Sequence, residues 1–380
     1  MKSNGRVFYV CFYCEPEVEG KIITYPSVIS KIDYVSSSIK RLGKEVVLVS
    51  IAPSINGEFK GYESTIDGKE KHIYLPSTNS KNKIVQKLNF LLHNRKITKF
   101  LEKNIKENDT ILVYHSLYNR MWLKKINKKY PDKVVLQIED VFSEISEKTK
   151  KFNEIEWKLF KQMKKCICVN DIIIDDLKCV PQKMVSYGSY NLPKKYNVEK
   201  GEKIKLVYAG VIEQERKAAF LAIDAMEHLT DDYELHILGF GTDENIKALE
   251  ERIEQVNNQK NCKSITFHGK KTGEEYWKFL QGCDIALSTH SYDEKSFASA
   301  DYTFPSKILT YLANNLRVVA QKLQVLEKSA VSEYITFYDE PNSILVADAI
   351  KSININDIYD SRKLIDILNN EFLSNIEKLL

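Results

Sequence analysis

Two cations follow a glycine at the end of a predicted strand in the second half of the chain. The apolar strand Ile204–Ala209 ends at Gly210, and Arg216 and Lys217 stand at the start of the next predicted helix. A glycine lets the backbone approach a ligand closely, and paired cations at a helix N-terminus can bind a diphosphate through charge and helix dipole. The residues therefore favour diphosphate recognition, and a solvated Arg-Lys pair on a helix surface is the alternative.

A second group of residues suited to an anion lies in the segment YTFPSKILTYLANNLRVVA, residues 302–320. Pro305 opens a predicted helix, and beside it Ser306 and Lys307 offer free backbone N–H groups and a cation at the sheet edge. The turn Gly239-Phe-Gly241 lacks the third glycine of a dinucleotide fingerprint, which disfavours a dehydrogenase. Every strand of this half thus ends in glycine or a polar residue, including Gly239, Gly269 with Lys270 after it, and His290.

The first half offers a histidine and two carboxylates at the ends of predicted strands. His115 follows the strand TILVY, and an imidazole there can donate to a hydroxyl group or shield developing charge. Glu139 and Asp140 end the next strand, where one carboxylate could accept a proton from an acceptor hydroxyl or orient it. A surface histidine and a helix-capping role for Asp140 are the alternatives.

The elements that must position these residues alternate between strand and helix along the chain. In the first half the pattern predicts strands 6–13, 45–51, 72–75, 110–114, 133–138 and 165–169, and helices 28–42, 83–104, 118–129 and 148–163. The polar stretch 191–203 has the composition of a linker. After it the pattern predicts strands 204–209, 233–238, 264–268, 284–288 and 317–321, and helices 217–228, 243–256, 274–280 and 305–313. A capping box of Thr272 and Glu275 should open the helix 274–280. This pattern predicts an α/β protein of two Rossmann-like halves, followed by an amphipathic helix over residues 361–380.

Length and composition agree with two folded domains. The chain has 380 residues, with 43% hydrophobic and 28% charged residues, which exceeds the length at which a single core usually divides. Apolar stretches are too short to span a bilayer, and the N-terminus lacks a secretory pattern, so a cytoplasmic protein is expected. Residues 81–165 hold 21 Lys and Arg against 10 Asp and Glu, which makes the first half basic although the whole chain carries only +4.

The order of motifs in the second half resembles one enzyme family. AG-x5-RK, LGFG, FHG, DIALS and FPSKILTYLANNLRVVA follow one another as in the donor-binding half of GT-B nucleotide-sugar glycosyltransferases, nearest the retaining family 4-like group. In the first half KVVLQIEDV and VSYGSYNLP resemble that family more loosely. The resemblance implies a GT-B fold, with an acceptor-side domain over residues 1–195, a donor domain over residues 196–360, and a C-terminal helix over residues 361–380 packed on the body.

The resemblance also implies roles for particular residues. Arg216 and Lys217 would contact the donor diphosphate, and the helix that begins near Ser306 and Lys307 would supply backbone amides to it. The remaining residues implied at the donor site are Gly210, Gly239, Gly269, Lys270, Tyr302 and Thr310. Tyr302 and Thr310 stand where the family has the two carboxylates of E-x7-E, and Val211 stands where many members have a basic residue. His115, Glu139 and Asp140 would serve the transferred sugar or the acceptor.

The function that these observations predict is transfer of a sugar from a nucleotide diphosphate sugar, with UDP-sugar favoured, to a polysaccharide or lipid-linked glycan. The resemblance implies retention of the anomeric configuration. Independence of metal and other cofactors is expected because Lys, Arg and helix N-termini can stabilise the leaving diphosphate. A non-catalytic GT-B partner subunit and a nucleotide-sugar epimerase of the same fold are the alternatives, and nucleic-acid binding is disfavoured because no aromatic-interleaved motif is present.

One segment of the basic half predicts contact with an anionic membrane surface. Residues 81–106 carry a net charge of +7, and apolar residues at near-helical spacing accompany the cations. Such a basic amphipathic helix could dock on the inner face of the cell membrane, where a lipid-linked acceptor would lie. The alternative is a helix that packs its apolar face on the sheet of its own domain.

Overall fold

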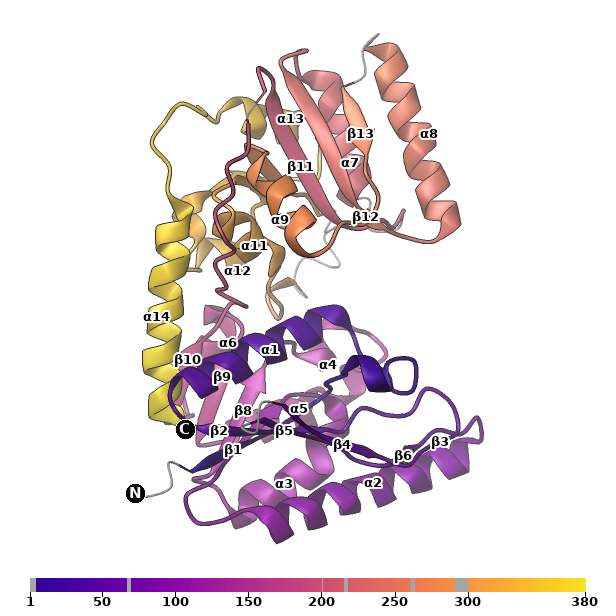
Figure 1. Cartoon of the computed structure of the whole chain (residues 1–380), viewed down its shortest axis with the longest axis vertical. Helices are drawn as coiled ribbons and strands as arrows, with labels where there is room; N and C mark the ends of the chain where they lie inside the picture. The colour runs from indigo at the N-terminus through magenta and orange to yellow at the C-terminus, as the bar shows by residue number, and fades with distance from the viewer. Residues whose placement is uncertain (1–4, 67–69, 200, 215–217, 261–263, 291–299) are drawn as a thin grey trace. The chain divides into compact units, whose positions relative to one another are not determined.

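The computed structural model describes residues 5–66, 70–199, 201–214, 218–260, 264–290 and 300–380 (Figure 1). The chain divides into two compact units, which are described separately. Unit 1 comprises Met1–Ser189 with Asn370–Leu380, and unit 2 comprises Tyr190–Asn369. Both are α/β units with mainly parallel sheets, as the sequence predicts.

The sheet of unit 1 has the strand order β10-β9-β8-β7-β1-β2-β5-β4 in the described part of the chain. Neighbouring strands are parallel except β4, which pairs antiparallel with β5. The strands are β1 (Arg6–Cys11), β2 (Glu45–Ser50), β4 (Tyr62–Ile66), β5 (Glu70–Tyr74), β7 (Thr110–Tyr114), β8 (Val134–Ile138), β9 (Lys165–Cys168) and β10 (Gln182–Val185). The short strands β3 (Glu58–Phe59) and β6 (Ser77–Thr78) form a separate antiparallel pair. The sequence pattern missed β3, β4, β6 and β10, which are short or lack a long apolar run.

Helices cover both faces of this sheet. Helix α1 lies on one face, and α2 and α3 lie on the other (Figure 1). The helices are α1 (Pro26–Arg41), α2 (Lys83–Asn104), α3 (Arg120–Lys129), α4 (Phe142–Ile145), α5 (Asn153–Lys161) and α6 (Asp171–Asp176), with short 3₁₀ turns η1 (Pro16–Val18), η2 (Leu117–Asn119) and η3 (Lys150–Phe152). The predicted helix 148–163 is wrong in detail, because η3 and α5 replace one continuous helix.

The sheet of unit 2 has the order β13-β12-β11-β14-β15-β16 among its described strands, all parallel. The strands are β11 (Ile204–Val211), β12 (Tyr233–Phe240), β13 (Ile265–Phe267), β14 (Ile285–Ser288), β15 (Arg317–Gln321) and β16 (Ile335–Tyr338). The helices are α7 (Ala218–Ala225), the 3₁₀ turn η4 (Met226–His228), α8 (Asp243–Gln259), α9 (Gly273–Gln281), α11 (Lys307–Ala313), α12 (Gln324–Glu327) and α13 (Ser343–Lys351), with the turn η5 (Ser332–Tyr334). Side chains of α7, α8 and α13 form one buried cluster with strand residues of this sheet.

Two helix ends of unit 2 differ in their capping, and one of them had been predicted. Thr242 caps α8, because its side chain accepts a hydrogen bond from the backbone N–H of Asn245 at 3.3 Å. The predicted capping box of α9 is wrong: the Thr272 side chain makes no capping hydrogen bond, and Glu275 pairs instead with Lys271. Lys271 lies four residues before Glu275, about one helical turn, so the opposite charge is the stronger partner for this carboxylate.

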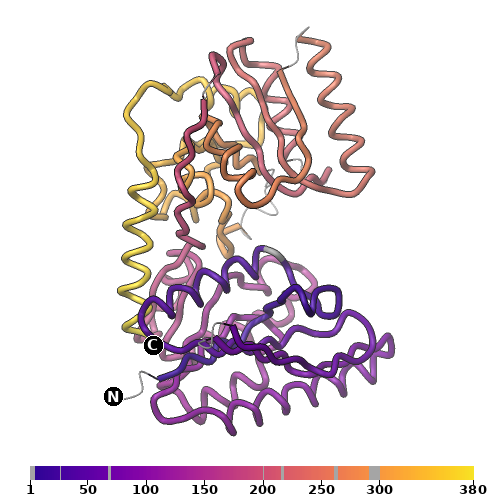
Figure 2. The backbone as a smooth tube through the Cα atoms, in the orientation of Figure 1, coloured from indigo at the N-terminus to yellow at the C-terminus, as the bar shows by residue number. Residues whose placement is uncertain are grey.

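The C-terminal helix α14 (Ser361–Leu379) begins in unit 2 and ends in unit 1, as the yellow end of the tube in Figure 2 shows. In unit 2 its first residue, Ser361, is buried and donates to the carbonyl of Leu312 at 2.7 Å. In unit 1 the chain end is fixed by the Thr110 hydroxyl, which donates to the carbonyl of Leu380 at 2.7 Å, and by Lys165, which donates to Leu379 at 2.8 Å.

Candidate functional site

The carboxyl edge of the unit 2 sheet carries the residues predicted for donor binding. The order of the sheet reverses between β11 and β14, and open parallel sheets bind ligands outside the carboxyl ends of strands at such a point. Gly210 lies near the end of β11, Gly239 lies beside it on β12, and Gly269 follows β13. The Gly239 N–H donates to the Gly269 carbonyl at 3.0 Å, so the structure brings these three glycines together.

Glycine is required at two of these positions because other atoms approach the backbone. A Cβ atom at Gly239 would overlap the carbonyl oxygen of Gly210. A Cβ atom at Gly210 would overlap the Nζ of Lys307 and crowd the hydroxyl of Tyr208. The Lys307 ammonium therefore lies directly over the Gly210 backbone, 5.6 Å from the Tyr208 ring centroid. The predicted pairing of a glycine turn with a cation from the FPSK segment is thus present at this edge.

Tyr311 holds the start of helix α11 against the end of β11. Its buried hydroxyl accepts a hydrogen bond from the Ala209 N–H at 3.1 Å and donates to the Ala209 carbonyl at 3.3 Å. The ladder with β14 covers only Leu206 and Val207, so Ala209 lies beyond it and needs another partner. The hydroxyl supplies that partner and fixes Lys307, one turn earlier on α11, over Gly210.

The helix start differs from the expectation of free amides. The backbone N–H of Ser306 donates to Phe304, and that of Ile308 donates to Pro305, so these groups are already bonded. The side chain of Ser306 is exposed and makes no capping hydrogen bond. At this helix start the exposed Ser306 hydroxyl is therefore more accessible to a ligand than these two amides.

The other predicted donor residues fall at different places. Lys270 is exposed, and its ammonium lies 5.4 Å from the ring centroid of Phe240 at the end of β12. Tyr302 and Thr310 are half-buried, in the turn before α11 and within that helix. Arg216 and Lys217 lie outside the described residues, directly before α7. Their contact with a diphosphate remains a prediction.

His115 is enclosed by side chains of unit 1 and does not face open space, contrary to expectation. It is 2% exposed, packs against Phe142 and Phe160, and its Nε2 lies 2.6 Å from Glu156 Oε1. Glu156 also accepts the N–H groups of Phe142 and Ser143 at 3.2 and 2.8 Å. Burial raises the pKa of Glu156, but the hydrogen bonds and charge of its partners outweigh burial and hold that pKa below its ordinary value. The His115–Glu156 pair fixes the start of α4. A catalytic role for His115 would therefore have to act indirectly, through the backbone at the start of α4.

Glu139 belongs to a network of polar groups at the carboxyl edge of unit 1. Its Oε1 accepts from Gln137 Nε2 at 2.5 Å and lies 3.4 Å from Lys31 Nζ on α1. Tyr9 donates to Gln137 at 2.6 Å, and Lys31 donates to the backbone and hydroxyl oxygens of Ser186 at 3.3 and 3.2 Å. Burial lowers the pKa of Lys31, and Glu139 opposes this shift. The network holds the carboxylate in one place at a sheet edge.

Asp140, next to Glu139, is half-buried and does not cap the following helix. Helix α4 begins after Val141, which makes no side-chain capping hydrogen bond, and the carboxylate of Glu156 accepts the first N–H groups. The helix-capping alternative for Asp140 is therefore wrong. Its role toward an acceptor hydroxyl stays a prediction.

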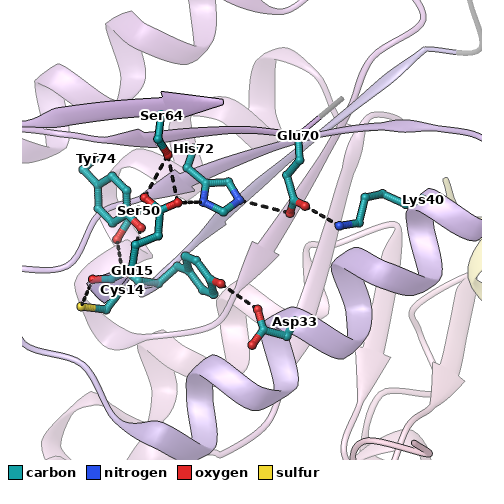
Figure 3. Close-up of polar contacts among 10 residues, drawn as sticks. Cys14, Glu15, Asp33, Lys40, Ser50, Ser64, Glu70, His72 and Tyr74 are labelled. Atoms are coloured by element: carbon teal, nitrogen blue, oxygen red, sulfur yellow. Dashed lines mark hydrogen bonds and ion pairs between the residues drawn. The ribbon is translucent and has the colours of Figure 1, made fainter. Parts of the chain in front are cut away.

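A second polar network secures the loop after β1, and Figure 3 shows its side chains. His72 is buried between Glu15, at 2.7 Å from its Nδ1, and Glu70, at 3.2 Å from its Nε2. Ser64 donates to Glu15 at 2.9 Å, and Lys40 pairs with Glu70. Burial lowers the pKa of His72, but the contact with Glu70 and the charge of Glu15 outweigh burial and raise it above the ordinary value. The network ties the loop after β1 to β4 and β5.

Sequence reasoning missed Lys31, Gln137 and the His72 network. Lys31 occupies a buried position of α1 between apolar residues, and a lysine inside an otherwise apolar helix stripe is the signal that could have identified it. His72 lies on β5 between exposed Lys71 and buried Ile73 and gives no comparable signal, because its partner Glu15 is 57 residues away in sequence.

Comparison with known proteins agrees with this architecture. Residues 191–366 match the family model described as glycosyl transferases group 1. Solved structures are similar over nearly the whole chain, at low identity. An E. coli trehalose-6-phosphate structure bound with UDP-2-fluoro glucose has a TM-score of 0.67 and 10% identity, covering 99% of both chains. A glycosyltransferase from Rickettsia africae has a TM-score of 0.61 and 15% identity, covering 98% of this chain and 94% of the other.

A third similar structure is an α,α-trehalose-phosphate synthase (UDP-forming) from Burkholderia xenovorans in complex with glucose-6-phosphate. Its TM-score is 0.62 at 8% identity, over 98% of this chain and 100% of that one. The comparison with curated proteins found no match. These likenesses establish two Rossmann-like domains of the GT-B fold, and residues 191–366 are a group 1 glycosyltransferase domain. The chain therefore combines a GT-B fold with a glycosyltransferase domain over residues 191–366.

Two further observations concern only the described residues. No helix among them is long and apolar enough to cross a membrane. No group of three or more His, Cys, Asp or Glu side chains in the same part of the chain is placed to hold a metal ion.

Proposed function

We propose that the protein transfers a sugar, with retention and without a metal ion, from a UDP-sugar to a hydroxyl group of a polysaccharide or lipid-linked glycan. The observation that carries this proposal is the edge of the unit 2 sheet, where Lys307 lies over the close-packed turns of Gly210 and Gly239. A backbone without side chains lets a diphosphate approach, and the ammonium supplies a charge-assisted hydrogen bond. A UDP-sugar is favoured because a similar fold binds UDP-2-fluoro glucose.

In this reaction the bond between the anomeric carbon and the diphosphate oxygen breaks, and its electron pair leaves with UDP. The acceptor oxygen forms the new glycosidic bond and loses its proton, for which the carboxylate of Glu139 is the proposed acceptor. Lys307, with Arg216 and Lys217, would stabilise the charge on the departing diphosphate. Lys31 and Gln137 would keep Glu139 in position, because both already contact its carboxylate.

The test of this proposal is nucleotide binding followed by turnover. Isothermal titration with UDP, GDP and ADP should give the tightest binding for UDP. Double replacement Arg216→Ala and Lys217→Ala should abolish that binding while the thermal unfolding profile stays intact. Unchanged UDP affinity in the double variant would remove the diphosphate assignment. UDP binding without turnover of any UDP-sugar would identify the protein as a non-catalytic partner subunit.

Metal independence and retention have separate measurements. Turnover should persist in EDTA, since cations of the protein stabilise the leaving group, and activity that returns only with added manganese would contradict this. The anomeric configuration of the product, read by NMR coupling constants, should match that of the donor. An inverted product would overturn the retaining assignment and leave the donor assignment in place.

We also propose that helix α2 contacts an anionic membrane surface. Its first half exposes apolar side chains, with Ile84 81%, Leu88 55% and Leu91 44% accessible, while Ile97 and Leu101 of its second half are buried. The second half therefore packs on its own domain, and the exposed first half is the part for which we propose membrane contact. Cations around exposed apolar groups favour an anionic bilayer, at about 1 kcal/mol per Lys or Arg near the surface.

Sedimentation with anionic vesicles at low salt tests this contact. Wild-type protein should pellet, and replacement of Leu88 and Leu91 by Gln should reduce the bound fraction, as should replacement of Lys96, Lys99, Lys103 and Lys106 by Gln. A protein that fails to pellet, or variants that pellet equally well, would exclude α2 as the contact.

A further inference from the structure

A groove of about 830 Å³ opens on unit 1, and none of the assigned site residues is among its lining residues. Most of its lining comes from the first half of α2, strand β6, the turn η2 with the start of α3, and the turn η3. Pro53, which follows β2, and Leu117, which follows β7, belong to its lining. The groove therefore lies at the carboxyl edge of the parallel sheet, where ligands of such folds bind.

The charged side chains that line this groove are all cations. They are Lys83, Lys87, Arg120 and Lys151, and no aspartate or glutamate lines the groove. Among the described residues no carboxylate forms an ion pair with any of these four side chains. Four cations that face one hollow without counter-charge repel one another, and an anionic ligand would relieve that repulsion.

Arg120 is held in position before any ligand arrives. Its guanidinium lies 5.1 Å from the ring centroid of Phe90 and 5.0 Å from that of Phe152, and its Nη1 donates to the Leu117 carbonyl at 2.7 Å. A planar guanidinium fixed between two rings loses little freedom when its other N–H groups bind a phosphate or carboxylate. The same groups can bind such an anion with two parallel hydrogen bonds.

The groove also has surfaces that suit a sugar ring. Tyr118 is 62% exposed and packs edge-on against Phe90, at 6.1 Å between ring centroids. An exposed aromatic face attracts the C–H groups of a pyranose, which carry partial positive charge. Asn79, Asn89 and Thr149 add amide and hydroxyl groups to the lining, and such groups can pair with sugar hydroxyls.

The positive end of the α2 dipole is not what would hold the ligand. Asn82 caps this helix, and its side chain accepts the N–H groups of Ile84 and Val85 at 2.9 and 3.3 Å. The first amides of α2 are therefore occupied. The side chains of Lys83, Lys87 and Arg120 must supply the attraction.

We propose that this groove binds a phosphorylated sugar as the acceptor of the transfer reaction, with the phosphate against Arg120 and Lys87 and the pyranose against Tyr118. The inference rests on the proposed glycosyltransferase function and specifies its acceptor class. The phosphate can belong to a soluble sugar phosphate or to a lipid-linked sugar phosphate, because the groove recognises the group that both share.

Isothermal titration of the full chain tests the proposal with four probes. These are glucose 6-phosphate, glucose, glucose joined through phosphate to a farnesyl chain, and UDP. The variants are Arg120→Gln and Lys87→Gln, and the control is Lys124→Gln, an exposed lysine of α3 that does not line the groove. Lys87 is exposed on the helix surface, so its variant keeps the fold even if Arg120→Gln does not.

We expect a phosphorylated probe to bind and glucose to bind at least tenfold more weakly. Each groove variant should bind the phosphorylated probe at least tenfold more weakly, which is about 1.4 kcal/mol. The Lys124→Gln control should bind this probe as wild type does, and the affinity for UDP should stay unchanged in all three variants. Tighter binding of the farnesyl compound than of glucose 6-phosphate assigns the lipid-linked source, and equal binding assigns the soluble one. The inference is overturned if glucose binds as tightly as the two phosphorylated probes, or if Lys87→Gln binds those probes with unchanged affinity. Failure of wild-type protein to bind UDP refutes the proposed function instead.

Discussion

Replacement of Tyr311 by Phe should destabilise unit 2 and weaken donor binding together. The hydroxyl of Tyr311 is the partner of both the N–H and the carbonyl of Ala209, at a point where β14 no longer pairs with β11. Phenylalanine fills the same space, so the change removes the two hydrogen bonds and leaves a buried backbone donor and acceptor without them. An unsatisfied buried group costs about 1–3 kcal/mol, which sets the expected loss of unfolding free energy at about 2 kcal/mol.

The effect on donor binding follows from the position of this tyrosine on α11. Lys307 lies one helical turn before Tyr311, and a helix released from Ala209 can no longer hold the ammonium over Gly210. We expect the Kd for UDP to rise about threefold to tenfold, which is about 0.7–1.4 kcal/mol. For a unit of this size the loss of stability lowers Tm by about 4–8 °C.

Differential scanning calorimetry and titration with UDP measure the two effects. Tyr359→Phe is the matched control, because its hydroxyl donates to the Leu316 carbonyl at 2.9 Å just before β15, at the opposite edge of the same sheet. That variant should lose stability and keep its UDP affinity. If Tyr311→Phe binds UDP as wild type does while losing stability, then α11 does not position the donor site and the reasoning is refuted.

Three further predictions concern single side chains. Lys307→Ala should raise the Kd for UDP at least about tenfold, because a charge-assisted hydrogen bond is lost; titration showing a normal Kd would exclude the ammonium as a ligand. Glu139→Gln should lower kcat by about 10²–10⁴-fold with UDP affinity unchanged, and steady-state kinetics with normal kcat would remove the proton-acceptor role. For His72, whose pKa is raised in the folded state, the stabilisation is complete below pH 6.5 and declines as pH rises through that raised pKa. The difference in unfolding free energy between wild type and His72→Gln, from urea titrations, should therefore shrink from pH 6.5 upward, and a difference that grows with pH would contradict the His72 network.

Much of the fold could be predicted because local pattern decides which elements form. Apolar runs bounded by glycine and polar residues predicted strands such as β7 and β15 with their observed bounds, and helix α2 likewise. Elements with weak local signals were missed, including β16 and α13 in unit 2. Short strands such as β3 and β6 form only because a partner from elsewhere in the chain completes their hydrogen bonds, and single-sequence patterns contain no information on that partner.

The candidate site divides in the same way. The glycine at the end of β11 and the cation of the FPSK segment could be read from the sequence, because each belongs to a local strand-turn-helix signal. The burial of His115 could not be predicted, since it depends on Glu156, 41 residues later, and on the packing of Phe160. The same holds for the lysine that faces Glu139, which reaches it from α1 across more than 100 residues of sequence.

The sequence by itself determined the α/β class, the division into two Rossmann-like halves, and the glycine and lysine residues of the donor edge. These follow from periodicity and turn chemistry, which act over a few residues. The tertiary structure alone decided that Tyr311 fixes the helix of Lys307, that Glu139 is held by Lys31, and that Arg120 stands between Phe90 and Phe152 in a groove without carboxylates. Those arrangements bring together residues from different elements, and their energies depend on burial and distance, which exist only once the chain has folded.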